Sequence, residues 1–114
     1  MATGATLHDL LEAMYGVKTR VRQNPKTDNI GTTIEKIADS NPNRLTLLVN
    51  NLSSHAIYIS PDNLVSTKRG IYIAPAGGSV VMQWDRDFSL VSQEWYAISD
   101  AADSDIYVLE LLSY

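Results

Sequence analysis

Residues 44–60 read RLTLLVNNLSSHAIYIS, and this stretch sets the character of the C-terminal part of the chain. Leu45, Leu47 and Val49 recur at every second position, which is the period of a β-strand. The NNLSS segment that follows is rich in asparagine and serine, whose side chains bond their own backbone in turns. The AIYIS segment then forms a second strand, so the region opens with two strands joined by a turn.

Four further strand-like segments follow, with turn sequences between them. They are residues 70–74 (GIYIA), 79–84 (SVVMQW), 94–99 (EWYAIS) and 105–112 (DIYVLELL). The intervening turns contain glycine, which supplies positive φ, and proline, which fixes φ. No helical crossover lies between the strands, so a parallel sheet is excluded. We predict a mainly β fold: an antiparallel β-sandwich or a small, jelly-roll-like barrel.

The start of the chain has a helical pattern instead. Thr6 and Asp9 have the spacing of a capping box, and Gly16 is a stop signal, so we predict a short helix over residues 6–15. Such a helix is marginal alone, and its apolar face needs a partner surface. The residues of this candidate docking face are Leu7, Leu10, Leu11 and Met14.

The segment between the helix and residue 44 is polar and rich in turn formers. We interpret residues 17–31 as an extended arm, with an edge strand as an option because Val17, Thr19 and Val21 alternate with basic residues. The TTIE sequence at residue 32 resembles another cap and predicts one further turn of helix. The predicted organisation is therefore a docking segment over residues 1–43, followed by a β-sandwich domain over residues 44–114.

Three of the strands share an apolar–tyrosine–apolar triplet. Because strand side chains alternate between faces, the isoleucines should fill the core and the tyrosines should lie outside. The tyrosines are Tyr58, Tyr72 and Tyr107. Two interpretations stay open: they form cross-strand pairs on a half-covered sheet, or they belong to an interface with another subunit.

Charge and composition exclude several functions. The net charge is −4, and residues 45–114 carry three basic against eight acidic side chains, which disfavours nucleic-acid binding. Lys18, Arg20 and Arg22 form a basic cluster, interpreted as a solvated patch near a helix end, with a nucleic-acid contact as the alternative. The chain has no cysteine, which excludes disulfides and thiolate zinc sites. No apolar run approaches the ~20 residues of a membrane span.

The sequence gives no support for catalysis. It contains two histidines, His8 and His55, and no G-x-S-x-G, P-loop or G-x-G-x-x-G pattern. Three aspartates lie close together over residues 100–105, but without the order of an EF-hand, so a solvated turn is favoured over a calcium site. We expect no catalytic, cofactor-binding or metal-binding residues and no enzyme activity.

Aromatic residues near strand ends offer one alternative function. Trp84, Trp95 and Tyr96 could stack on sugar rings if they were exposed together. Tryptophan in a small sandwich more often belongs to the core or to a subunit interface, because aromatic side chains bury large apolar areas.

Residues 44–114 resemble small structural proteins of tailed-phage virions, of the capsid-decoration and head-fibre kind. The similarity covers 71 of 114 residues. It is carried by the strands at 44–51, 57–60, 95–98 and 108–110 and by the turns at 66–70 and 73–79. These are strand and turn patterns, so no functional residue is carried over.

The resemblance implies a non-enzymatic virion protein that is assembled in the host cytoplasm. Its expected role is a capsid decoration or cement subunit that binds the major capsid protein, with homo-oligomers, trimers in particular, as the expected assembly. No cofactor, nucleic acid or membrane is expected as a partner. The alternative functions are a carbohydrate-binding module or a tail or fibre accessory protein.

Overall fold

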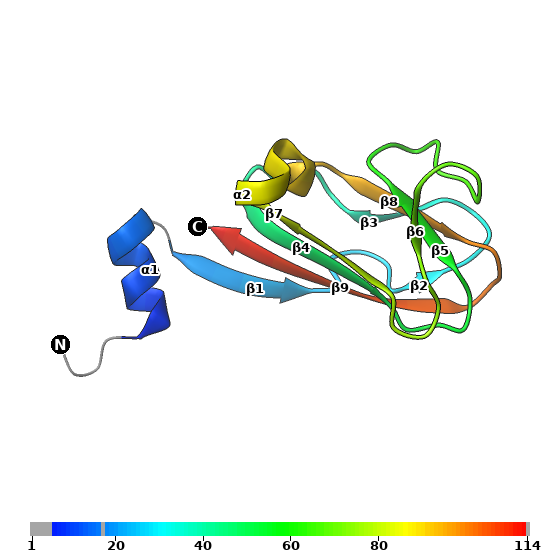
Figure 1. The fold of residues 1–114 in the computed structure, drawn as a ribbon, viewed down its shortest axis with the longest axis horizontal. Coiled ribbons are helices and arrows are strands. Elements are labelled where there is room, and N and C mark those ends of the chain that lie inside the picture. Colours follow the sequence, from blue (N-terminus) through cyan, green and yellow to red (C-terminus); the bar gives the residue numbers. More distant parts are fainter. Residues whose placement is uncertain (1–5, 17, 114) are drawn as a thin grey trace.

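Two antiparallel sheets face each other, and one helix projects from the end of the sandwich (Figure 1). The computed structural model describes residues 6–16 and 18–113, apart from the side chains of His8 and Leu11. The molecule measures 52 × 24 × 21 Å, and the projecting helix lies at one end of its longest axis.

The larger sheet is built around the C-terminal strand. Its members are β1 (Thr19–Gln23), β2 (Asn29–Ile30), β4 (Arg44–Asn51), β7 (Ser79–Gln83) and β9 (Ser104–Ser113). The strand order is β1-β9-β4-β7, and β2 pairs with the first part of β9. Every pair is antiparallel, as the missing helical crossovers predicted.

The smaller sheet has the order β3-β8-β5-β6. Its members are β3 (Glu35–Ala38), β5 (Ile57–Ser60), β6 (Ile71–Ile73) and β8 (Trp95–Ser99). The connection from β7 to β8 crosses between the sheets through a short helix, α2 (Trp84–Asp87), and a 3-10 helix, η1 (Phe88–Ser92). This crossing had been expected as a turn. The two sheets together confirm the predicted mainly β sandwich.

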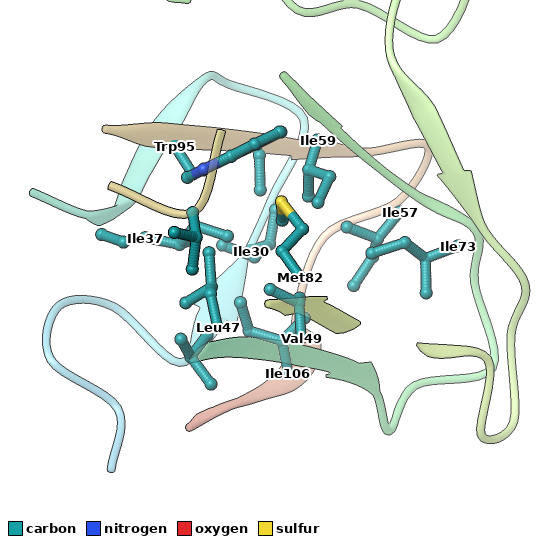
Figure 2. Packing of buried hydrophobic residues seen from close by; sticks show 14 residues of the cluster. Ile30, Ile37, Leu47, Val49, Ile57, Ile59, Ile73, Met82, Trp95 and Ile106 are labelled. Atoms are coloured by element: carbon teal, nitrogen blue, oxygen red, sulfur yellow. The ribbon is translucent and has the colours of Figure 1, made fainter. Parts of the chain in front are cut away.

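The core lies between the sheets and follows the predicted alternation (Figure 2). Leu47 and Val49 of β4 and Ile57 and Ile59 of β5 are fully buried, and Trp95 of β8 is 1% exposed. Each such aliphatic side chain contributes roughly 1.5–3 kcal/mol on burial. Apolar side chains from both layers meet here, so neither sheet is stable without the other.

Helix α1 (Leu7–Tyr15) forms as the sequence predicts. The Thr6 side chain accepts a hydrogen bond from the Asp9 amide, and the Asp9 carboxylate accepts one from the Thr6 amide. Gly16 ends the helix in the left-handed conformation, at φ 71°, and its N–H donates to Glu12 O. Glycine adopts this conformation without the strain that a Cβ would add.

The prediction of a helical turn after residue 32 is wrong, because this segment forms strand β3 and pairs with β8. A register shift between Lys36 and Ala38 places the neighbouring residues Ile37 and Ala38 both inside. Because of the bulge, the apolar residues of this strand do not recur at every second position. Their spacing in the sequence resembles that of a helix instead.

The sandwich takes strands from both sides of residue 44. Strands β1, β2 and β3 all lie within the expected docking segment, and Ile30 and Ile37 are fully buried in the core. The position of the domain boundary stays a prediction, which truncation can test.

Candidate functional site

The outward side of the larger sheet carries an apolar patch, here called the outer apolar face. Its residues are Val21, Leu48, Val81, Leu109 and Leu111. The strand register makes the patch continuous: Leu48 lies directly between Val81 and Leu109, and Val21 pairs with Leu111. Val21 is 59% exposed, and the other four are half-buried. This sheet is therefore apolar on both of its sides.

A groove of ≈ 430 Å³ lies at the end of this face, beside α1. It is lined by Tyr15, Thr19, Leu45, Thr46, Trp84, Asp85 and Leu111. Tyr15 is 59% exposed and Trp84 is 52% exposed, so the groove presents two open aromatic rings. Four separate elements and the C-terminal strand contribute to it, which is why no local sequence pattern reveals it.

Two local features open the groove. A register shift in β4 between Arg44 and Thr46 turns Arg44 inward and leaves Leu45 and Thr46 half-buried along the groove. Strand β7 ends at Gln83, and α2 then carries Trp84 and Asp85 over the sheet end.

A carboxylate fixes the start of α2. Asp87 Oδ2 accepts a hydrogen bond from the Gln83 amide at 2.9 Å. This bond, together with the neighbouring Arg86 guanidinium, holds the pKa of Asp87 below its usual value. The ionised carboxylate therefore stabilises the turn that presents Trp84.

The predicted docking face of α1 is bare in the structure. Leu7 is 72% exposed, Leu10 is 52% exposed and Met14 is 70% exposed. Leu11 belongs to the same predicted face, but its side chain lies outside the described residues. An amphipathic helix with an open apolar face therefore stands beside an apolar groove.

On the opposite side of β4 and β9, a buried ion pair closes the end of the core. Arg44 Nη2 lies 2.6 Å from Glu110 Oε1, and both side chains are fully buried. Arg44 makes five hydrogen bonds: two to Glu110 and one each to the carbonyl oxygens of Asp39, Val91 and Gln93. These bonds use every N–H of the guanidinium.

A second cation completes this network. Arg22 of β1 donates from Nε to the other oxygen of Glu110 at 2.8 Å. The network thereby connects β1, β4 and β9 to two segments that flank strands of the smaller sheet. These are Asp39, directly after β3, and the residues Val91 and Gln93, just before β8. The sequence analysis missed it, because a single arginine and a single glutamate 66 positions apart carry no pattern.

The three predicted interface tyrosines lie on two different faces. Tyr58 and Tyr72 are directly opposite each other on β5 and β6, with ring centroids 5.6 Å apart on the outside of the smaller sheet. Tyr107 lies on β9, in the larger sheet. The outward placement of Tyr58 and Tyr72 follows the prediction, whereas Ile71 is 43% exposed and does not fill the core. An interface role for the tyrosines stays a prediction.

The predicted sugar-stacking set does not form one surface. Trp95 is 1% exposed and donates from Nε1 to Leu90 O, so its assignment as a stacking residue is wrong. Tyr96 alternates to the other side of β8 and lies under the Lys36 ammonium, at 5.6 Å from the ring centroid. A hydrogen bond to Glu94 raises the pKa of Lys36, so this cation stays charged. Of the three predicted stacking residues, Trp84 is the most exposed, at 52%.

Ser53 and His55 lie close together in the turn after β4. Ser53 Oγ donates to the backbone oxygen of His55 and accepts from its amide, so these bonds stabilise a turn rather than pair a hydroxyl with an imidazole. Among residues 6–16 and 18–113, no three His, Asp or Glu side chains gather as a metal site. No described helix has the length and apolarity needed to cross a bilayer.

Comparison with known proteins adds little to this geometry. No family model matches the sequence, and no curated protein matches it. One similar solved structure comes from Bacillus endospore appendages, described as a novel family of disulfide-linked pili. The two chains are 10% identical, the alignment covers 85% of this chain and 88% of that one, and the TM-score is 0.46. A likeness at this level carries no functional argument, and the phage resemblance stays a prediction.

Proposed function

We propose that this chain is a non-enzymatic structural subunit that works by contacting other proteins. The observation that carries the proposal is the outer apolar face, which continues through the groove toward the bare face of α1. A contiguous apolar surface of this kind is costly to leave in water and marks an interaction site. The net charge of −4 keeps the rest of the surface soluble.

The finer form of the proposal is a virion component. The resemblance of residues 44–114 to tailed-phage structural proteins supports a capsid decoration or cement subunit that binds the major capsid protein. In this form the chain is assembled in the host cytoplasm and ends in the virion.

A double variant of the outer apolar face tests the general proposal. Leu48→Thr/Leu109→Thr makes the centre of the face more polar with a β-branched residue that suits strands. We expect the wild-type chain to self-associate or to bind particles, and the variant to lose at least half of this association. Ile98→Thr, a half-buried position on the outside of the smaller sheet, is the control. A wild-type chain that is monomeric and binds nothing overturns the proposal.

Co-sedimentation with tailed-phage capsids tests the finer form. Binding that saturates at a fixed ratio to the major capsid protein is expected of a decoration subunit. Self-association without capsid binding would refute the capsid role and would mean that the chain is a structural subunit of another assembly.

The exposed Trp84 ring favours one second candidate, a carbohydrate-binding groove. Trp84 and Tyr15 offer stacking surfaces, and Thr46 and Asp85 offer hydrogen bonds to hydroxyl groups. A glycan array tests it: a hit that Trp84→Ala abolishes supports this candidate, and an array without hits removes it.

A further inference from the structure

Among the described residues of helix α1, the large apolar side chains are mostly uncovered by the rest of the chain. It has nine residues, and a helix of this length is marginal in water without tertiary packing. Its capping box and its glycine stop stabilise both ends, but the apolar side chains between them remain mostly exposed. The helix is therefore stabilised at both ends, and its apolar side chains remain available to a partner surface.

We infer that α1 of one copy docks against the groove and the outer apolar face of a second copy, and that the exchange is reciprocal. This inference rests on the proposed function, because it names the partner of the same surface. The result is a two-fold dimer with its axis near the junction of α1 and β1, in which each helix covers the other body.

The exposed apolar area is sufficient for such a dimer. Six large apolar side chains at this end of the molecule are each about half to three-quarters exposed: Leu7, Leu10, Met14, Tyr15, Val21 and Trp84. With ~150–250 Å² for a large side chain, they offer on the order of 700 Å² in each copy. Burying this area on both copies gives about 1,400 Å², within the ~1,200–2,000 Å² of stable interfaces.

Charge disfavours a strand of the second copy as the occupant. Lys18, Arg20 and Arg22 make the β1 region basic, so direct pairing of two β1 edges would bring like charges face to face, which is unfavourable. Asp85 is the one charged residue among the described residues that line the groove.

The connection between α1 and β1 disfavours docking onto the same body. Only residues 16–18 separate the two elements, and the left-handed Gly16 fixes the direction in which the helix leaves. Tyr15, at the end of α1, already lines the groove. Figure 1 shows that α1 stands beyond the end of the sandwich rather than over either sheet.

Solution mass, measured by sedimentation across concentration, tests the inference. We expect the wild-type chain to reach twice its 12.6 kDa. Leu10→Glu/Met14→Glu should raise the dissociation constant at least ~100-fold, because it removes two large apolar anchors. At a concentration at which the wild-type chain is monomeric, the melting temperature of the body should not change, since both side chains are exposed. The matched control is Leu64→Glu, an equally open leucine at 60% exposure elsewhere, which should remain a dimer.

Disulfide trapping separates exchange from folding back onto the same body. The chain has no cysteine, so Met14→Cys in α1 and Thr46→Cys in the groove are clean single probes. When the two variants are mixed and oxidised, a covalent heterodimer that reduction reverses supports exchange. If only the Met14→Cys/Thr46→Cys double variant forms a bond, within one chain, then α1 folds back and the inference is wrong.

Failure of this inference is distinguishable from failure of the proposed function. Assembly that survives Leu10→Glu/Met14→Glu but is lost in Leu48→Thr/Leu109→Thr refutes helix exchange and keeps the structural subunit. A wild-type chain that stays monomeric and binds no particle refutes both.

Discussion

Replacing Glu110 by glutamine should destabilise the protein strongly, although the side chain keeps its shape. Glu110 is the single carboxylate against the fully buried Arg44 guanidinium, at 2.6 Å. Glutamine leaves that cation buried without a counter-charge, which costs about 3–5 kcal/mol. Arg22 contributes little to the loss, because its side chain is 47% exposed and can return to water.

This loss is large for a chain of 114 residues. Domains of this kind have about 5–15 kcal/mol of stability in total. With an unfolding entropy of ~2.1 cal/mol/K per residue, a loss of 3–5 kcal/mol lowers the melting temperature by about 12–20 °C. Salt at 1 M should not change the effect, because screening acts on exposed pairs and not on a buried one.

A double-mutant cycle with Arg44→Met and Glu110→Leu separates the pair from its surroundings. Glu110→Leu strands the buried Arg44 cation, and Arg44→Met leaves the buried Glu110 carboxylate with only the half-exposed Arg22. The double variant removes the buried pair, so it should cost less than the sum of the single variants by at least ~2 kcal/mol. It should not reach wild-type stability, since the three carbonyls that Arg44 satisfies lose their donor at ~1–3 kcal/mol each. Arg22→Met is the control and should cost at most ~1 kcal/mol.

Urea denaturation followed by tryptophan fluorescence is the assay, because Trp95 is buried close to this network. Two results would refute the reasoning. One is a Glu110→Gln variant that loses less than ~1 kcal/mol, which is the range of an exposed pair. The other is a cycle in which the two single effects simply add, which would mean that the buried charges do not depend on each other.

The remaining predictions concern a turn, the N-terminal segment and pH. Gly78→Ala should cost about 1–3 kcal/mol in thermal denaturation, because a Cβ would lie 2.6 Å from a backbone nitrogen, whereas Gly31→Ala, which meets nothing within 4 Å, should not. Deleting residues 1–16 should leave the melting temperature unchanged at a concentration at which the full chain is monomeric, whereas deleting 1–43 should abolish cooperative folding; a folded 44–114 fragment would contradict this. Hydrogen bonds from a backbone amide, a serine and an arginine lower the pKa of Asp62 below 3.8, so the unfolded state binds more protons there. Its contribution to stability is therefore full above about pH 4 and is lost as pH falls through the folded pKa, and Asp62→Asn should flatten that slope.

The elements that the sequence predicts well are those fixed by local patterns. The capping box and the glycine stop define α1 within a residue, and alternation of buried and half-buried residues defines β9 and the part of β4 that follows its register shift. In each case the residues that decide the structure are neighbours along the chain. The antiparallel arrangement also follows, because the connections are too short for helical crossovers.

The elements that the sequence misses depend on contacts between distant segments. Strand β3 is held by β8, and its bulge disguises the strand period. The groove needs a register shift in β4 together with a helix that begins at Trp84. Trp84 and Trp95 look alike in the sequence, yet one is 52% exposed and the other 1%. Their different roles follow from η1, whose Leu90 carbonyl receives the Trp95 indole.

In helix α1, the local sequence and the structure of a single copy disagree. Every local feature of α1 favours a helix, yet its large apolar side chains, as far as the structure describes them, stay about half to three-quarters exposed in one copy. Polar residues at Leu7, Leu10 and Met14 would serve an isolated surface helix better, because exposed apolar area favours aggregation. Folded sequences are usually consistent across levels, and an inconsistency confined to one element points to its function. The disagreement disappears if the folded unit is the assembly, in which a second body supplies the surface that this helix lacks.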